Sequence, residues 1–465
     1  MPNKSVEPDF GLAAPLTLYA NPKRLTINVT RSEIRSAPIC SRLTILSTYA
    51  IVWPPTTQGR SMNSAPPSPR GRLAYLDWLR FIVVLSLAPF HASISFTGMG
   101  SVYVYDTPVR DILLAGSTPV GAGPLVLTVF TVFMDNWFMN LLFLVSGIGA
   151  TLSLRKRNGA QFLGERCNRL LLPLLFGTVL VVSVQSWLRA LSFGRFSGGF
   201  LAFFPSFFNG VYTGPQSTGN YDWGHLWFLA YLFVFSALAL PLFLSIQRKG
   251  EASRVLSVAG RFAAMPLILL PALWTGFLEA LFRPGWPGSL GTLINDWAYF
   301  TVFLSFFLAG YIVGSVPELL QAIEKHRLAA LILGVTAFLA RIATYRVVAV
   351  PDGYNTANVV AQAFRGIAAY GLVMAAMGYG QRYLNGQSRM LGIARDLSFP
   401  LYILHYAPLT AATYLLLNSG LSIWTRWILA VAASWSFVAL FTFLARFMPL
   451  VRGFFGIRQP ADRRS

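Results

Sequence analysis

The sequence predicts an all-α protein that crosses a lipid bilayer about ten times, and two observations support that fold class. The 465 residues are 55% hydrophobic and only 12% charged, with a mean hydropathy of +0.55. Many apolar stretches reach about 20 residues, the length that an α-helix needs to cross a hydrocarbon layer roughly 30 Å thick. No soluble domain needs so many segments of that length. We therefore expect a polytopic membrane protein with the lipid bilayer as its surroundings.

Ten apolar segments are the expected membrane spans. Their approximate bounds are 75–97, 131–153, 170–192, 225–246, 262–282, 297–315, 328–347, 360–380, 397–418 and 424–448. Basic residues gather in every second loop, beginning with 155–157, whereas the loops on the opposite side hold only three arginines. Because basic loops stay on the cytoplasmic side, an even number of spans places both termini in the cytoplasm.

The net charge of +20 does not indicate a nucleic-acid partner. The basic residues lie in short loops between spans, which is the pattern of membrane topology rather than of a nucleic-acid binding stripe. The two cysteines, Cys40 and Cys167, form neither a disulfide framework nor a zinc-type spacing. We expect no bound metal.

Composition divides the chain into three parts. Residues 1–72 are polar and rich in Pro and Ser, and their apolar piece Leu43–Trp53 is too short to span, so we expect a disordered leader. A start at Met62 would leave a short basic leader that runs straight into the first span, and we hypothesise that start. Residues 73–456 form the membrane domain, and residues 457–465 form a basic cytoplasmic tail.

Arg80 and His91 lie eleven residues apart in one hydrophobic stretch, 76–96. Eleven residues are close to three helical turns, so both side chains fall on one helix face, about 20° apart and roughly 16 Å apart along the axis. Hydrocarbon does not tolerate such groups without a partner, which makes them functional-site candidates. Asp77, one turn before Arg80, is its expected ion-pair partner, although a pair that only anchors the helix end explains the same spacing.

His91 is the residue that we expect to act as a general base. An imidazole titrates near neutral pH, so it can take the proton of a hydroxyl while that oxygen attacks an acyl carbonyl. Pro89 leaves a carbonyl of the preceding turn without its helical bond and is expected to bend the span beside His91. The alternative is a packing histidine that is hydrogen-bonded to a neighbouring helix.

Arg166 and Arg169 are one turn apart at the cytoplasmic start of the third span. This spacing suits two guanidiniums that bind phosphates, and Arg80 at similar depth adds a third. Ser146 and Gly147, near the cytoplasmic end of the second span, offer close backbone approach to the same ligand. A span that merely enters the membrane from the cytoplasm also begins with basic residues, so the arginine pair alone is not decisive.

The expected loop 193–224 on the outer side is longer than a connection needs, and aromatic residues follow it. Trp223 and Trp227 offer flat faces to sugar rings, while Asp222 and His225 offer hydrogen bonds to hydroxyls. We expect these four residues to bind an acceptor. The alternative is an aromatic belt at the membrane interface.

Two further ionisable residues lie inside expected spans. His405, near the middle of the ninth span, is either a second catalytic group or a polar contact between helices. Glu279, near the outer end of the fifth span, either orients an imidazole or reaches to the interface. We group both with the acceptor side.

Five motifs in order resemble the membrane-bound acyltransferase family 3. They cover about residues 72–456 and are Arg80-(ten residues)-His91, Phe143–Gly147, Arg166-x-x-Arg169, His225–Leu229 and Ser398–His405. His225–Leu229 and Arg446–Leu450 look most like the glucan biosynthesis protein C branch, which is associated with succinylating periplasmic glucans. Ile148 departs from the family pattern, which usually has an aromatic residue there.

The resemblance implies ten core helices and transfer of an acyl group, acetyl or succinyl, from cytoplasmic acyl-CoA to a hydroxyl of a carbohydrate on the outer side of a bacterial inner membrane. His91 would be the catalytic histidine with Arg80 as its motif partner, and Arg166 and Arg169 would face the donor. Acyl-CoA would be a co-substrate, with no bound cofactor.

Two readings from other classes explain part of the pattern. A transporter or flippase for an anionic lipid or sugar would also carry ionisable groups such as His91 and Arg80 inside the membrane. It does not explain the pair Arg166 and Arg169 or the ordered set of motifs. A sensor or scaffold that kept the fold would tolerate the loss of His91.

Overall fold

A computed structural model of the protein describes residues 73–98, 120–212, 217–264, 267–287, 293, 295–448, 451 and 455. The expectations for the leader, for Met62 and for the C-terminal tail lie outside these residues. The described residues are mostly helical. They contain an isolated β-bridge between Val211 and Tyr221. The predicted all-α fold is confirmed.

Eight helical stretches in the described part of the chain are long and apolar enough to cross a membrane. They are α3 (Ala74–Thr97), α5 (Ala122–Leu154), the stretch Gly159–Ser192, the stretch Gly224–Lys249 that contains α10 (Trp227–Lys249), α13 (Trp297–Ser315), α15 (Arg327–Val347), α16 (Thr356–Tyr383) and α19 (Ile423–Ala445). They coincide with eight of the ten predicted spans. The protein is an integral, polytopic membrane protein.

The fifth and ninth predicted spans are present as shorter helices. The fifth contains α12 (Pro271–Phe282), and Pro271 suits the first position of a helix, where no N–H needs to be donated. The ninth contains α17 (Arg389–Leu404) and α18 (Tyr406–Leu416), which are separated at His405. His405 is therefore the residue at the junction of the two helices.

Shorter helices connect the long ones. They are α6 (Gly159–Arg166), α7 (Leu172–Gly177) and α8 (Ser183–Ser192) within the third stretch, and α9 (Phe200–Phe203), α11 (Arg254–Arg261) and α14 (Pro317–Lys325) between stretches. The basic loops follow α5 and α10, and we call their side of the molecule the inner side. The outer side holds the start of α5 and of α13, the end of α15 and the start of α16.

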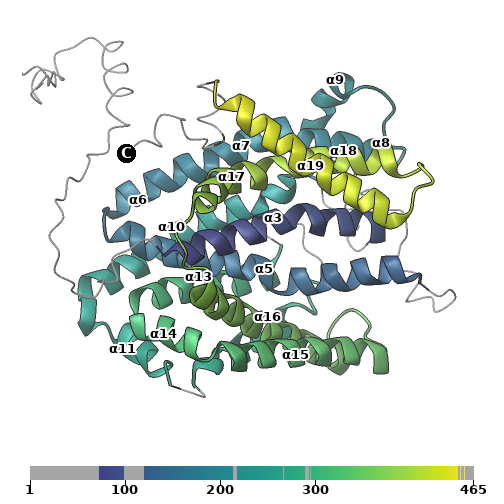
Figure 1. Ribbon diagram of the computed structural model, residues 1–465. Coiled ribbons are helices and arrows are strands. Elements are labelled where there is room, and N and C mark those ends of the chain that lie inside the picture. The colour runs from purple at the N-terminus through teal and green to yellow at the C-terminus, as the bar shows by residue number, and fades with distance from the viewer. Residues whose placement is uncertain are drawn as a thin grey trace, which may run out of the picture. The chain divides into compact units, whose positions relative to one another are not determined.

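Neighbouring helices pack along their lengths (Figure 1). The helix α3 contacts α5 and α17, α5 contacts α13, and α16 lies against both α12 and α15. Large apolar side chains point outward from the bundle, for example Leu339 of α15 and Leu440 of α19, which are 57% and 59% exposed. In a bilayer these side chains meet lipid tails rather than water.

Glycines allow α5 and α13 to approach until their backbones touch. A Cβ atom added to Gly147 of α5 would overlap the backbone carbonyl of Phe307, and one added to Gly310 of α13 would overlap that of Leu144. Small residues at a helix contact are the usual means of close packing in membranes, where no hydrophobic force holds helices together. The contact therefore depends on the absence of both side chains.

We expect Gly147→Ala to destabilise the protein by about 1–3 kcal/mol, because the methyl group has no space between α5 and α13. The matched control is Gly164→Ala in α6, where an added Cβ meets no atom within 4 Å. Alanine is the better helix former by about 0.5–1 kcal/mol, so this control should be neutral or stabilising. Thermal unfolding of both variants in detergent measures the difference, and equal melting temperatures would contradict the packing argument.

Candidate active site

Three histidines from separate segments meet inside the membrane domain. His91 belongs to α3, His225 to the 3-10 turn Gly224–Leu226 before α10, and His405 to the junction of α17 and α18. The ring centroid of His405 lies 5.4 Å from that of His91 and 5.0 Å from that of His225. The Tyr406 ring lies 4.4 Å from that of His91. The structure thus joins two predicted acceptor-side histidines to the predicted catalytic one.

Hydrogen bonds assign the tautomer of His405. Its Nδ1 lies 2.8 Å from the carbonyl oxygen of Leu401 and 3.0 Å from that of Tyr402. A carbonyl oxygen only accepts, so Nδ1 carries the hydrogen and Nε2 holds a lone pair. The Nε2 atom is buried and has no hydrogen-bond partner among the described residues. His405 therefore presents a basic nitrogen to the interior of the bundle.

Both ring nitrogens of His225 are engaged. Its Nε2 donates to the carbonyl of Ile403 at 2.9 Å, so Nδ1 is left to accept a hydrogen bond from the Gln185 amide at 3.1 Å. The backbone carbonyl of His225 in turn accepts a hydrogen bond from the Tyr402 hydroxyl at 2.8 Å. This set of bonds fixes the start of α10 against the end of α17. His225 therefore positions these two helices and has no ring nitrogen left to act as a base.

The break between α17 and α18 supplies the acceptors for these bonds. Pro408 has no N–H to offer the carbonyl of Leu404, so one helical bond is missing, whereas the N–H of His405 still donates to Leu401 at 3.2 Å and that of Leu409 to His405 at 3.3 Å. Imidazole donors bond to carbonyls of the last turn of α17 in addition, and the Ser434 hydroxyl donates to the carbonyl of His405 at 2.6 Å. Such side-chain bonds hold the weakened turn against its neighbours.

An ion cluster occupies the inner end of α3. Asp77 accepts from Arg80 at 3.4 Å, as predicted, and from the Arg395 Nε at 2.6 Å. Arg80 also donates to the carbonyl of Val145 at 3.3 Å, which ties α3 to α5. The expected span bounds put Arg395 in the loop two residues before the ninth span, but it lies within α17 and shares the Asp77 carboxylate. Its place outside the expected span concealed this role.

The predicted phosphate-binding arginines gather near this cluster. Arg169 is 75% exposed and pairs with Glu165 at 3.1 Å. Arg166 is half-buried, and Arg80 and Arg169 both lie close enough to repel it electrostatically. Arg169 lies within the segment Cys167–Leu171, which is π-helical, a distortion that is frequent at functional sites. The inner end of α3 therefore carries an excess of positive charge.

Ser146 and Gly147 differ in how deeply they are buried. Gly147 is buried against the backbone of α13, so its lack of a side chain serves helix packing. Ser146 is half-buried. Gly149, one turn further along α5, is the glycine that faces the guanidinium of Arg80, since a Cβ there would lie 3.3 Å from its Nη2.

On the outer side, Asp222 holds its own loop together. Its carboxylate binds Arg189 at 2.7 Å and accepts from the backbone N–H of Gly224 at 2.8 Å. The Arg189 guanidinium also lies over the Tyr212 ring at 3.6 Å. Burial raises the pKa of the Tyr212 phenol above its ordinary value, which keeps the ring neutral beneath the arginine.

The two predicted sugar-stacking tryptophans have different surroundings. Trp227 is stacked on Phe303 with ring centroids 5.4 Å apart and is half-buried. Trp223 is also half-buried and lies at the end of the outer loop, just before the 3-10 turn Gly224–Leu226. Both belong to the segment that carries His225 into the histidine cluster.

Glu279 does not contact the histidines. Its carboxylate binds Arg283 at 2.8 Å and Arg365 at 3.5 Å, and Arg365 also binds Asp135 at 2.8 Å. The sequence analysis missed Asp135, Arg341 and Arg365. All three are ionisable residues inside predicted spans, so the criterion that selected His91 would have found them.

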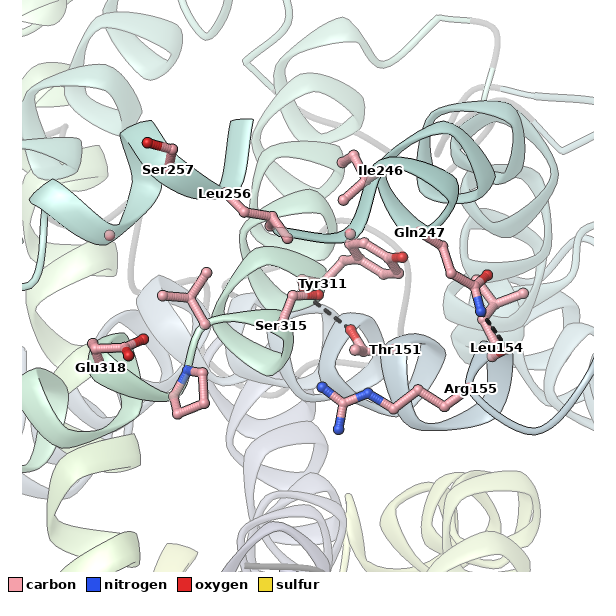
Figure 2. A pocket seen from close by; sticks show the side chains of 14 residues that line it. Thr151, Leu154, Arg155, Ile246, Gln247, Leu256, Ser257, Tyr311, Ser315 and Glu318 are labelled. Carbon is pink, nitrogen blue, oxygen red and sulfur yellow. Dashed lines mark hydrogen bonds between the residues drawn. The ribbon is translucent and has the colours of Figure 1, made fainter. Parts of the chain in front are cut away.

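A pocket of about 560 Å³ opens at the inner ends of α5, α10 and α13 (Figure 2). Thr151 and Arg155 of α5 line one side, and Glu318 of α14 lies at the other. None of the residues predicted to bind the donor lines it. Because Val145 and Gly149 face Arg80, this pocket lies on the opposite face of α5 from the arginine cluster.

The fold and the site define a class of protein: a polytopic helical membrane protein with histidines and arginines placed along the inside of its bundle. Residues 73–446 match the family model of an acyltransferase domain, and the chain belongs to this family, the membrane-bound acyltransferase family 3. The protein is thus a membrane acyltransferase that transfers groups other than aminoacyl groups. No curated protein and no solved structure shows significant similarity to the chain.

We expect Asp77→Asn to lower the free energy of unfolding by about 1–3 kcal/mol, because two guanidiniums lose the carboxylate that they share. The loss stays moderate because the Arg80 side chain is 38% exposed. The control is Glu324→Gln, which removes an exposed pair with Arg382 at 3.7 Å and should cost less than about 1 kcal/mol. Unfolding in detergent compares them; a larger loss in the control would refute the structural role of Asp77.

Proposed function

We propose that the protein moves an acyl group, acetyl or succinyl, from cytoplasmic acyl-CoA to a hydroxyl of a glycan on the outer side of the bacterial inner membrane. The observation that supports this proposal most strongly is the placement of polar groups along α3. Asp77 and Arg80 lie at its inner end, and His91 lies about three turns further out with His405 and His225. Neither substrate then has to cross the membrane.

The donor binds from the inner side. Arg166 and Arg169 bind the coenzyme phosphates with Arg80, because guanidiniums pair with phosphate oxygens in a bidentate geometry. Arg169 is exposed and its pair with Glu165 is a surface contact of little energy, so a phosphate displaces it readily. The thioester end of the donor then extends outward along α3 toward His91.

His91 acts as the general base. Its imidazole takes the proton of the acceptor hydroxyl as that oxygen attacks the thioester carbon and forms the new C–O bond. The adduct then expels the coenzyme sulfur by breaking the C–S bond, and the imidazolium returns its proton to the sulfur. Because a thioester is already activated, positioning with one base supplies much of the acceleration. No covalent acyl-enzyme is required.

His405 is the partner of His91 in this step. Its ring is stacked on that of His91, and its Nε2 faces the bundle with a lone pair. This geometry lets His405 accept the proton from the acceptor or hold the acceptor hydroxyl beside His91. His225, with both nitrogens engaged, positions the junction that carries His405.

We infer that the acceptor is a glucan. The likeness of His225–Leu229 and Arg446–Leu450 to the glucan-succinylating branch supports this inference, as do the aromatic residues Trp223 and Trp227 at the outer approach. Aromatic faces suit sugar rings, which are otherwise difficult to bind by charge.

We expect His91→Ala to lower acyl transfer by about 10²–10⁴-fold, the usual contribution of a general base. The assay follows radiolabel from acetyl- or succinyl-CoA in inverted membrane vesicles loaded with glucan oligosaccharide. His326→Ala is the matched control, because His326 lies after α14 at the inner surface, and it should transfer at the wild-type rate.

His405→Ala separates the two histidines in the same assay. Loss of transfer in both variants supports the pair, and loss in His405→Ala alone would move the base to His405. Equal labelling in wild type and His91→Ala would remove His91 from the mechanism. Size-exclusion profiles verify that each variant remains folded, and uptake of label without transfer would favour a transporter.

A further inference from the structure

A second polar cluster lies within the membrane domain near its outer end. It consists of Asp135 of α5, Glu279 and Arg283 at the end of α12, Arg341 of α15 and Arg365 of α16. All except Asp135 are buried, with 3% to 9% of each residue exposed. We call these five residues the outer charge cluster. None of them takes part in the proposed transfer step.

Four of the five residues are paired with each other. Arg283 donates to both carboxylate oxygens of Glu279, at 2.8 and 3.2 Å. Arg365 bridges the two acids, with its Nη2 at 2.8 Å from Asp135 and its Nε at 3.5 Å from Glu279. The two carboxylates are therefore taken up by two of the three guanidiniums.

Arg341 has no carboxylate of its own. Its Nε and Nη1 atoms are buried and donate no hydrogen bond to any described residue, and the same is true of Nη1 of Arg283. The nearest aromatic contact of Arg341 is the Tyr345 ring at 5.8 Å. Arg341 nevertheless belongs to the cluster, since it interacts electrostatically with Arg365, Asp135 and Glu279.

The cluster thus holds three positive charges against two negative ones inside a helix bundle. A buried charge without a counter-charge costs several kcal/mol, and ionisable groups in membrane spans are normally paired. The unused Nε and Nη1 of Arg341 are charged donors, which make stronger hydrogen bonds to oxyanions than neutral donors do. One further anion would balance the charge and accept from Arg341.

The outer charge cluster reaches the surface of the bundle and is linked to the acceptor approach. Asp135 has a 36% exposed side chain, so the cluster reaches the surface of the bundle at this point. The Arg283 guanidinium lies 3.8 Å over the Tyr299 ring, which is stacked on Phe303 at 5.1 Å. Phe303 is in turn stacked on Trp227, whose helix begins beside the histidine cluster. A row of aromatic rings therefore connects the outer charge cluster with the acceptor approach.

We propose that Arg341 binds an oxyanion group, a carboxylate or a phosphate, that the acceptor glycan carries on its outer-side portion. This inference rests on the proposed function, because it assigns the charge of the acceptor in that reaction. Arg341 holds the acidic group, and the buried aromatic row packs the outer charge cluster against the segment that carries Trp227. An unsubstituted glucan would leave the donors of Arg341 unused, so the site selects glucans that carry an acidic substituent.

Equilibrium binding to the full-length protein in nanodiscs, without acyl donor, tests the proposal. The probes are glucuronate, glucose 6-phosphate and neutral glucose. We expect wild type to bind at least one sugar anion at least tenfold more tightly than glucose, and Arg341→Gln to lose that preference. Arg346→Gln is the matched control, because Arg346 is an exposed arginine in the last turn of the same helix.

The two anionic probes distinguish a carboxylate site from a phosphate site. Equal binding of glucose and both anions by wild type, or an unchanged preference in Arg341→Gln, would overturn the proposal. Arg341→Lys keeps the charge but removes the guanidinium donors, so it should bind with intermediate affinity and serves if Arg341→Gln does not fold. The assay contains no acyl donor, so its result does not depend on the transfer step and is separate from a failure of the transfer reaction.

Discussion

The interruption of the helix at His405 is the constraint on which the arrangement of the site depends. This junction lacks the helical bond to the Leu404 carbonyl, because Pro408 has no N–H. The carbonyl of Ile403 accepts from His225, and those of Leu401 and Tyr402 accept from His405. These bonds hold the start of α10 against α17 and fix which nitrogen of His405 is basic, so the junction determines both the structure and the chemistry of this region.

Charge is distributed unequally along the bundle, and its two charged clusters differ in how far they are buried and paired. At the inner end of α3, Asp77 serves two arginines and the remaining guanidiniums are partly exposed, which suits a site that receives a phosphate from water. The outer charge cluster is deeply buried and its pairing is incomplete. Excess positive charge at both ends is consistent with an enzyme whose donor and acceptor approach from opposite sides.

The sequence allowed most of the helices and part of the site to be predicted. Apolar stretches of membrane length mark their helices regardless of neighbours, because the bilayer imposes that length. The Asp77–Arg80 pair was predictable because both residues lie on one helix, one turn apart. Arg395 was not, since its partner is 318 positions away in the chain. Glu279 was selected as an ionisable residue inside an expected span, but its partner Arg365 on α16 depends on how the helices pack.

What the sequence determined by itself is therefore the class: a helical membrane protein, with the motifs of its acyltransferase family in order. Local spacing and hydrophobicity decide these properties, and they act over a few turns of one helix. Tertiary structure alone decided that His405 joins His91, that His225 is fully bonded and that Nε and Nη1 of Arg341 donate to no described residue. Hydrogen bonds and ion pairs extend only about 3–4 Å, so the chemistry of a side chain follows from which helix lies next to it.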